Sequence, residues 1–81
     1  MRVKVSFYSY FKDLAGCAET LAVLRDQGTL DELLTELTNR FPKLAPLRKS
    51  MLTAVGVDYQ DRSYVIKEGD EVSLFPPVQG G

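Results

Sequence analysis

The sequence TLDELLTELTNRFP, residues 29–42, predicts one amphipathic helix. Thr29 and Glu32 have the spacing of a capping box, in which the hydroxyl accepts from a backbone N–H and the glutamate reaches back. Pro42 is expected to end the helix, because the residue before a proline is pushed out of the α region. The apolar face that this spacing predicts consists of Leu30, Leu33, Leu34, Leu37 and Phe41.

Segments with a period of two flank the helix. In MRVKVSFY, residues 1–8, Val3, Val5 and Phe7 point to one side of a half-buried strand. The sequence SYFKDLAG, residues 9–16, favours a short helical turn closed by Gly16. Further strands are predicted at residues 18–26, with Leu21, Val23 and Arg25 on one face, at residues 51–57 and 70–76, and over the short apolar pair Val65 and Ile66.

One helix over a small mixed sheet is a two-layer α+β domain. The first and last strands alternate most clearly, so we expect them side by side at the centre of the sheet, each with one face under the helix. This arrangement resembles the ubiquitin-like β-grasp fold. We expect residues 1–76 to form the domain and residues 77–81 to form an extended tail.

Composition excludes several kinds of chemistry. Ten Lys and Arg residues against 11 Asp and Glu residues give a net charge of −1, which indicates neither nucleic acid nor an anionic membrane as partner. The 81 residues contain no histidine and one cysteine, which excludes the common catalytic triads and a thiolate metal site. No signal peptide or membrane span is visible, so a cytoplasmic protein is expected. The chain by itself is not expected to be an enzyme or to bind a cofactor.

The last six residues are Pro76, Pro77, Val78, Gln79, Gly80 and Gly81. Two prolines end the preceding strand and favour a stiff extended exit, and the glycines leave the terminal carboxylate unhindered. Such a carboxylate can be activated as an acyl-adenylate and then attacked by sulfur or by an amine. The tail therefore predicts a carrier whose functional group is Gly81, unless the two glycines are only a frayed end.

The run EGDEVSLFPPVQGG, residues 68–81, resembles the C-terminal signature of the MoaD/ThiS family of sulfur carriers. The start VSFYSYFKDLAG, residues 5–16, also resembles MoaD, and its helical excursion favours the molybdopterin synthase small subunit over the thiamin branch. The sequence departs from the family pattern at Gly56, where members usually have asparagine.

This resemblance implies a reaction cycle with several partners. A MoeB-like adenylyltransferase would use ATP to activate Gly81, and a cysteine desulfurase or rhodanese would supply the sulfur of a thiocarboxylate. The tail, from Pro76 to Gly81, would then enter a MoaE-like large subunit and give its sulfur to a pyranopterin precursor. The resemblance implies that the two subunits form a heterotetramer.

A carrier of this kind needs a docking surface. Strand parity places Tyr8 and Phe75 on the face of the sheet away from the helix, next to the tail, and the resemblance adds Tyr59. Exposed aromatic residues are enriched in protein interfaces, although these rings could simply cover the sheet. Three alternatives for the function stay open: a carrier for thiamin or another sulfur pathway, a ubiquitin-like modifier conjugated through Gly81, and an interaction module with an accidental tail.

Overall fold

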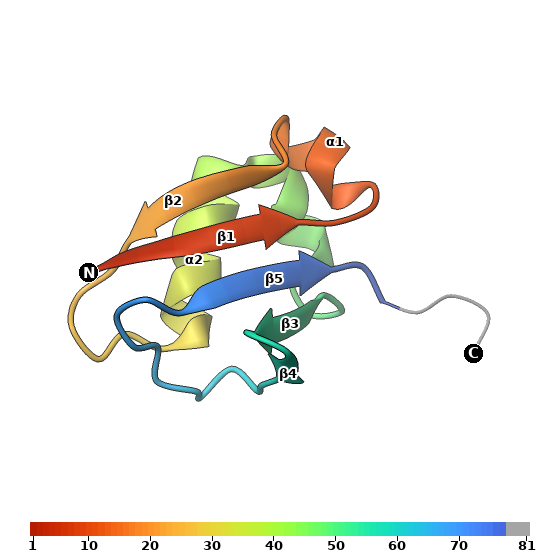
Figure 1. Ribbon diagram of the computed structural model, residues 1–81. Helices are drawn as coiled ribbons and strands as arrows, with labels where there is room; N and C mark the ends of the chain where they lie inside the picture. The colour runs from red at the N-terminus through yellow and green to blue at the C-terminus, as the bar shows by residue number, and fades with distance from the viewer. Residues whose placement is uncertain (78–81) are drawn as a thin grey trace.

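A five-stranded mixed sheet with one long helix on one face makes up the structure, a computed structural model that describes residues 1–77. The strand order is β2-β1-β5-β3-β4, and the terminal strands β1 and β5 lie side by side at its centre, as predicted (Figure 1). The structure shows that these two strands run parallel. The elements are β1 (Arg2–Phe7), α1 (Phe11–Ala15), β2 (Glu19–Val23), α2 (Leu30–Arg40), the 3-10 helix η1 (Pro42–Leu47), β3 (Leu52–Val55), β4 (Asp58–Tyr59) and β5 (Glu71–Phe75).

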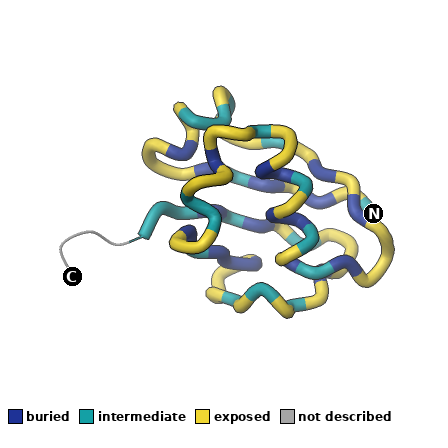
Figure 2. Tube along the Cα trace, turned by 180° about the vertical axis from the view of Figure 1, so that it is seen from behind, coloured by how far each residue is buried: buried dark blue, intermediate teal, exposed yellow. Residues whose placement is uncertain are grey.

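The core lies between α2 and the central strands. Val3, Val5 and Phe7 of β1 are buried, as are Val72 and Leu74 of β5. The leucines of the α2 stripe are buried against them, and Phe41 is half-buried where α2 ends. Figure 2, seen from the side of α2, shows the buried segments running along the inner strands and the inner side of the helix. Within residues 1–77, no second layer covers the opposite face of the sheet.

The N-terminus of α2 forms part of the predicted capping box. Thr29 Oγ1 accepts a hydrogen bond from the backbone N–H of Glu32 at 3.3 Å. The carboxylate of Glu32 accepts from the Arg25 guanidinium through two bonds of 2.7 Å, and no bond to the N-cap backbone N–H is found among residues 1–77. The hydrogen bond from Arg25 lowers the pKa of the Glu32 carboxyl, an effect that burial partly opposes. An ion pair with a bidentate guanidinium therefore replaces half of the predicted box.

Two segments of the sequence behave as their patterns indicated. Helix α1 ends at Gly16, whose φ of +79° is the left-handed value that glycine adopts without strain. Strand β2 forms with Leu21 and Val23 on one face, and that face is the open one, where both side chains are largely exposed. The intervening Ala22 is the residue of β2 that reaches the core.

The position of the short strand was predicted wrongly. Val65 makes only an isolated bridge to Thr29, and Ile66 is buried while its N–H donates to the carbonyl of Gly28. This backbone is bonded to the segment that leads into α2 and not to the sheet. The short strand between β3 and β5 is instead β4. It forms a hairpin with β3 through the turn at Gly56, where φ is +61°. Glycine and asparagine both adopt positive φ in such turns, so Gly56 is compatible with the hairpin.

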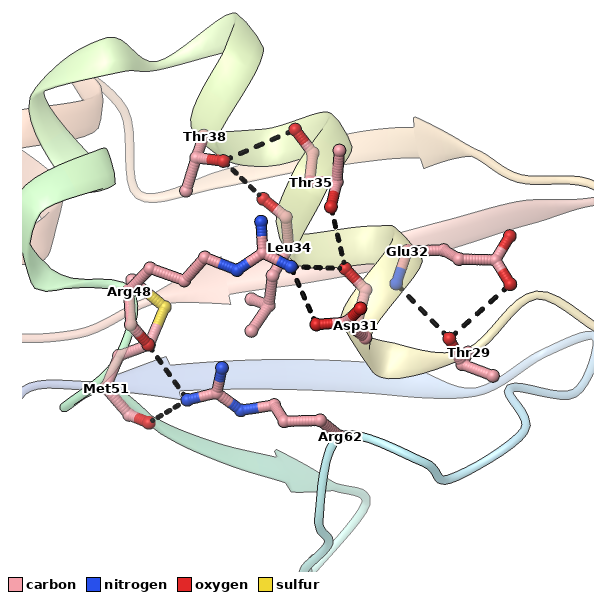
Figure 3. A network of polar contacts seen from close by, with 9 residues as sticks. All are labelled: Thr29, Asp31, Glu32, Leu34, Thr35, Thr38, Arg48, Met51 and Arg62. Carbon is pink, nitrogen blue, oxygen red and sulfur yellow. Dashed lines mark hydrogen bonds and ion pairs between the residues drawn. The ribbon is translucent and has the colours of Figure 1, made fainter.

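Polar contacts fix the loop before β5 against the start of α2 (Figure 3). One Nη of Arg62 donates to the carbonyls of Arg48 and Met51, at 2.9 and 3.0 Å. Arg48 in turn pairs with the Asp31 carboxylate at 2.7 Å, and the Asp31 N–H donates to the Arg62 carbonyl. These contacts hold the loop in place. Among residues 1–77, no helix is long and apolar enough to cross a membrane.

Candidate functional site

Three aromatic side chains gather on the open face of the sheet, and we call them the aromatic cluster: Tyr8, Tyr59 and Phe75. The rings of Tyr8 and Phe75 stack with centroids 4.6 Å apart and an angle of 15° between their planes. Tyr59 meets Phe75 edge to face at 6.2 Å. Tyr8 is 44% exposed and Tyr59 is 68% exposed, while Phe75 is half-buried between them. Phe75 is therefore the centre of the cluster.

Strand parity and register explain why these residues meet. Phe7 is opposite Leu74 in the parallel pair of β1 and β5, and both point into the core. The next residue of each strand faces the other way, and the Tyr8 N–H donates to the Leu74 carbonyl at 3.2 Å. Tyr59 joins from β4, where its register partner is Ala54 of β3. The structure thus brings together all three residues that the sequence analysis selected.

The tail begins directly beside the cluster. Strand β5 ends at Phe75, as the two prolines predicted, and Pro76 and Pro77 are half-buried. The remaining residues of the predicted tail, Val78, Gln79, Gly80 and Gly81, lie outside the described residues.

A hollow of about 550 Å³ adjoins the cluster on the same face. Its floor includes Ser6 and Ser73, which are register partners in β1 and β5 and whose side chains are short. Tyr8 lines it, together with three acidic residues from the β3–β4 hairpin, the loop before β5 and the start of β5: Asp58, Asp70 and Glu71. Asp58 is the register partner of the core residue Val55, so its side chain lies on the opposite side of the hairpin from that of Tyr59. We call this feature the acidic hollow, because no lysine or arginine is among the described residues that line it.

One carboxylate of the acidic hollow is held in place by its neighbours. Asp70 Oδ2 accepts from the hydroxyl of Tyr64 at 3.0 Å and from the N–H of Lys67 at 2.8 Å. The hydrogen bond to Asp70 raises the pKa of the Tyr64 hydroxyl, and burial adds to the effect. By contrast, the side chains of Asp58 and Glu71 make no hydrogen bond or ion pair within residues 1–77.

The described residues supply surfaces for recognition. Across residues 1–77, no group of three or more Asp, Glu, Cys or His side chains is placed to hold a metal ion. The whole chain contains no histidine. What the open face offers a partner is an aromatic cluster, an adjoining negative hollow, and the point from which the tail departs.

Fold and surface together define a ubiquitin-like β-grasp domain with an exposed aromatic face at the root of its C-terminal segment. The family model described as the ThiS family matches residues 5–81. The chain belongs to the ThiS family, as the resemblance to the MoaD/ThiS sulfur carriers indicated.

Curated relatives are similar over most or all of their length. The molybdopterin synthase sulfur carrier subunit of Chlamydomonas reinhardtii is 31% identical, and the match covers all of both chains. The human molybdopterin synthase sulfur carrier subunit is also 31% identical, with 99% of this chain and 94% of the human protein covered.

Solved structures agree with this fold. A putative molybdopterin converting factor subunit 1 from Pyrococcus furiosus superposes with a TM-score of 0.88 at 28% identity, covering 96% of this chain and 99% of that one. A chain of the Helicobacter pylori complex of subunits 1 and 2 of the molybdopterin-converting factor gives a TM-score of 0.71 at 26% identity over the full length of both chains. SAMP1 from Haloferax volcanii also has a TM-score of 0.88 over all of both chains, but its 19% identity shows the fold alone.

Sequence reasoning missed the acidic hollow. Its floor depends on Ser6 lying opposite Ser73, and Ser73 opposite Ala54, which is a matter of register between strands. The alternation of side chains along each strand assigns Ser6, Ser73 and Ala54 to the open face. It does not show that the three residues lie side by side in one row across the sheet. The acidic residues around them were visible in the sequence only as a polar segment before the last strand.

Proposed function

We propose that this chain is the sulfur carrier subunit of a molybdopterin synthase. The observation that carries the proposal is the match to curated sulfur carrier subunits over the full chain, with the family match extending to Gly81. The helical excursion at α1, which the sequence analysis associated with the molybdopterin branch, is present at Phe11–Ala15. The aromatic cluster at the root of the tail supports the same proposal, since a carrier must dock before its terminus can react.

Activation begins at the Gly81 carboxylate. A MoeB-like adenylyltransferase would transfer AMP from ATP to this carboxylate, releasing pyrophosphate and forming an acyl-adenylate. Sulfur at the oxidation level of sulfide would then attack the acyl carbon and displace AMP, which leaves a thiocarboxylate. A persulfide on a cysteine desulfurase or rhodanese would serve as donor if a second thiol cleaves the resulting acyl disulfide. ATP is thus used on the partner enzyme, and the carrier itself binds no cofactor.

Sulfur transfer would take place on a MoaE-like large subunit. The thiocarboxylate sulfur would form a bond to carbon of a pyranopterin precursor, and water would release the Gly81 carboxylate for another round. Two such transfers build one dithiolene. The catalytic side chains of this step belong to the large subunit, and the H. pylori complex of subunits 1 and 2 supports such a pairing. We place the cycle in the cytoplasm, where ATP and reduced thiols are available.

Intact-mass spectrometry tests the activation step. The chain is incubated with a MoeB-like adenylyltransferase, ATP and a sulfur donor, and a chain that lacks Gly81 serves as the control. The expected result is a mass gain equal to one oxygen replaced by sulfur, located at Gly81 and absent from the control. No gain, with an adenylyltransferase that activates another carrier in the same assay, would contradict the proposal.

A second step separates the remaining functions. The thiocarboxylated chain is mixed with a MoaE-like large subunit and the pyranopterin precursor, and dithiolene formation is measured. Transfer to a thiamin precursor in place of the pyranopterin would assign the chain to another sulfur pathway. Isopeptide adducts of Gly81 on lysines would assign it to protein conjugation.

A further inference from the structure

Strand β2 forms one edge of the sheet, and within residues 1–77 no strand pairs with its outer side (Figure 1). Its hydrogen bonds to the first strand determine which backbone groups face outward. Leu24 and Met1 exchange two such bonds, of 2.9 and 2.7 Å. Because bonded residues alternate along an antiparallel pair, every second residue of β2 points its N–H and C=O groups away from β1. These residues are Glu19, Leu21 and Val23.

Arg40, the last residue of α2, covers the middle of this edge. One of its Nη atoms donates to the outward-facing carbonyl of Leu21 at 3.1 Å and lies 3.6 Å from a carboxylate oxygen of Glu36. The guanidinium also lies over the Phe41 ring, 5.0 Å from its centroid. These contacts orient the guanidinium on the strand. Within residues 1–77, no other side chain bonds to an outward-facing backbone group of β2.

An uncovered edge of this composition would favour pairing between two copies of the chain. Leu21 and Val23 are apolar, and their side chains are 57% and 71% exposed. Strand edges with free donors and acceptors are templates for another strand. Two copies of β2 paired antiparallel around Leu21 would bond each Leu21 carbonyl to the N–H of the other Leu21 and place the two leucine side chains next to each other. The opposite edge of the sheet, β4, is only two residues long, which already limits pairing there.

From these contacts we propose that Arg40 prevents the β2 edge from pairing with a second copy of this chain. Its guanidinium occupies the carbonyl that such a pair would use, so pairing would have to break a charge-assisted hydrogen bond in each copy. Two paired copies would also bring two like charges together where their edges meet. The inference is independent of the proposed function.

The position of Arg40 on its helix does not by itself explain this contact. A cation suits the C-terminus of a helix, and Glu36 lies one turn earlier, as in an ordinary ion pair along a helix. Neither preference requires a hydrogen bond to a strand 19 residues away in the chain. The bond to Leu21 is therefore the feature that the proposal interprets.

Analytical ultracentrifugation of Arg40→Ala over a range of concentrations tests the inference. The matched control is R25A, because Arg25 also pairs with a glutamate of α2, Glu32, but its side chain contacts no outward-facing backbone group of β2. Both variants remove one positive charge, so a difference between them reports the contact with the edge. Thermal unfolding of each variant verifies that it is folded, and Arg40→Gln provides the same test if R40A is not.

The wild-type chain and R25A should sediment as monomers, and R40A should form dimers. The self-association constant of R40A should be at least about tenfold larger than that of the wild-type chain, since no charge-assisted hydrogen bond has to be broken. Arg40→Lys keeps the positive charge and should stay monomeric. In the R40A dimer, the outward-facing amides of Leu21 and Val23 should exchange with deuterium more slowly than in the wild-type chain.

A second variant tests whether the dimer forms through β2. R40A/V23K adds a lysine at an exposed position of the same edge, where a charge opposes strand pairing. This variant should be monomeric again. Self-association of R40A no stronger than that of the wild-type chain would overturn the inference. Dimers of R40A that persist in R40A/V23K would also overturn it, because they would form through another surface.

Discussion

Replacing Phe75 by alanine should separate docking from folding. The Phe75 ring is half-buried and contacts two other rings, with Tyr8 stacked at 4.6 Å and Tyr59 edge-on at 6.2 Å. Its loss should cost the isolated chain about 1–2 kcal/mol, since the ring lies outside the core and its aromatic contacts are worth about 0.5–1.5 kcal/mol each. A central aromatic anchor in an interface is worth more, about 2–4 kcal/mol. Binding to the large subunit should therefore weaken about 30- to 1,000-fold.

Two measurements on the same variant check this prediction. Urea unfolding gives the change in stability, and calorimetric titration with a MoaE-like large subunit gives the change in affinity. Leu21→Ala is the matched control, because Leu21 is an apolar residue on the same open face, 57% exposed and on the edge strand β2. The control should bind within about threefold of the wild-type chain. If F75A also binds within that range, the aromatic cluster is not the docking surface.

Three further changes probe the fold. Leu37→Ala removes a fully buried side chain of the α2 stripe and should cost about 2–5 kcal/mol in urea unfolding; a loss below about 1 kcal/mol would contradict the assigned core. Gly56→Ala should cost about 1–2 kcal/mol by the same measurement, because an alanine at φ +61° is strained even though nothing lies within 4 Å of the added methyl group. An unchanged stability would show that the turn relaxes. The pKa of the Glu32 carboxyl is lowered in the folded chain, so its contribution is present above the unfolded pKa of about 4.3 and is lost as the pH falls through the folded value. The difference in melting temperature between wild type and Glu32→Gln should thus be constant from about pH 6 to 8 and should shrink below about pH 4. A difference that persists at lower pH would exclude the ion pair with Arg25 as its source.

Local patterns were sufficient for the elements that carry the core. A strand reports its buried face through alternation, so Val3, Val5 and Phe7 were assigned correctly, and Tyr8 followed on the other face. The helix was equally clear, since its leucines repeat with the helical period. A pattern that only places two residues on the same face of a strand does not say whether that face is buried or exposed. Leu21 and Val23 were correctly placed together, but the sequence did not show that they point away from α2.

Features without a local sequence pattern could not be predicted in the same way. Strand β4 has only two residues, Asp58 and Tyr59, which is too short for any periodicity, and it exists because it pairs with β3. Val65 and Ile66 have the composition of a strand, yet their backbone bonds to the segment before α2. The acidic hollow likewise depends on the register between β1 and β5. For Val65, Ile66 and the hollow, the deciding hydrogen bonds join residues far apart in the chain, whereas β4 pairs locally and is simply too short to show a pattern.

Parallel pairing of the terminal strands brings the proposed docking surface next to the root of the tail. Because β1 and β5 run the same way, Tyr8, which follows β1, lies beside Phe75, which ends β5. With an antiparallel pair, the end of β1 would lie beside Glu71, about 13 Å from Phe75 at the other end of β5, at a rise of about 3.3 Å per residue. Six residues from Pro76 to Gly81 can span at most about 20 Å. A docking site displaced by that distance would use most of the reach of the tail. The fold therefore places the proposed docking surface where the short C-terminal segment of the proposed carrier would still reach into a partner's active site.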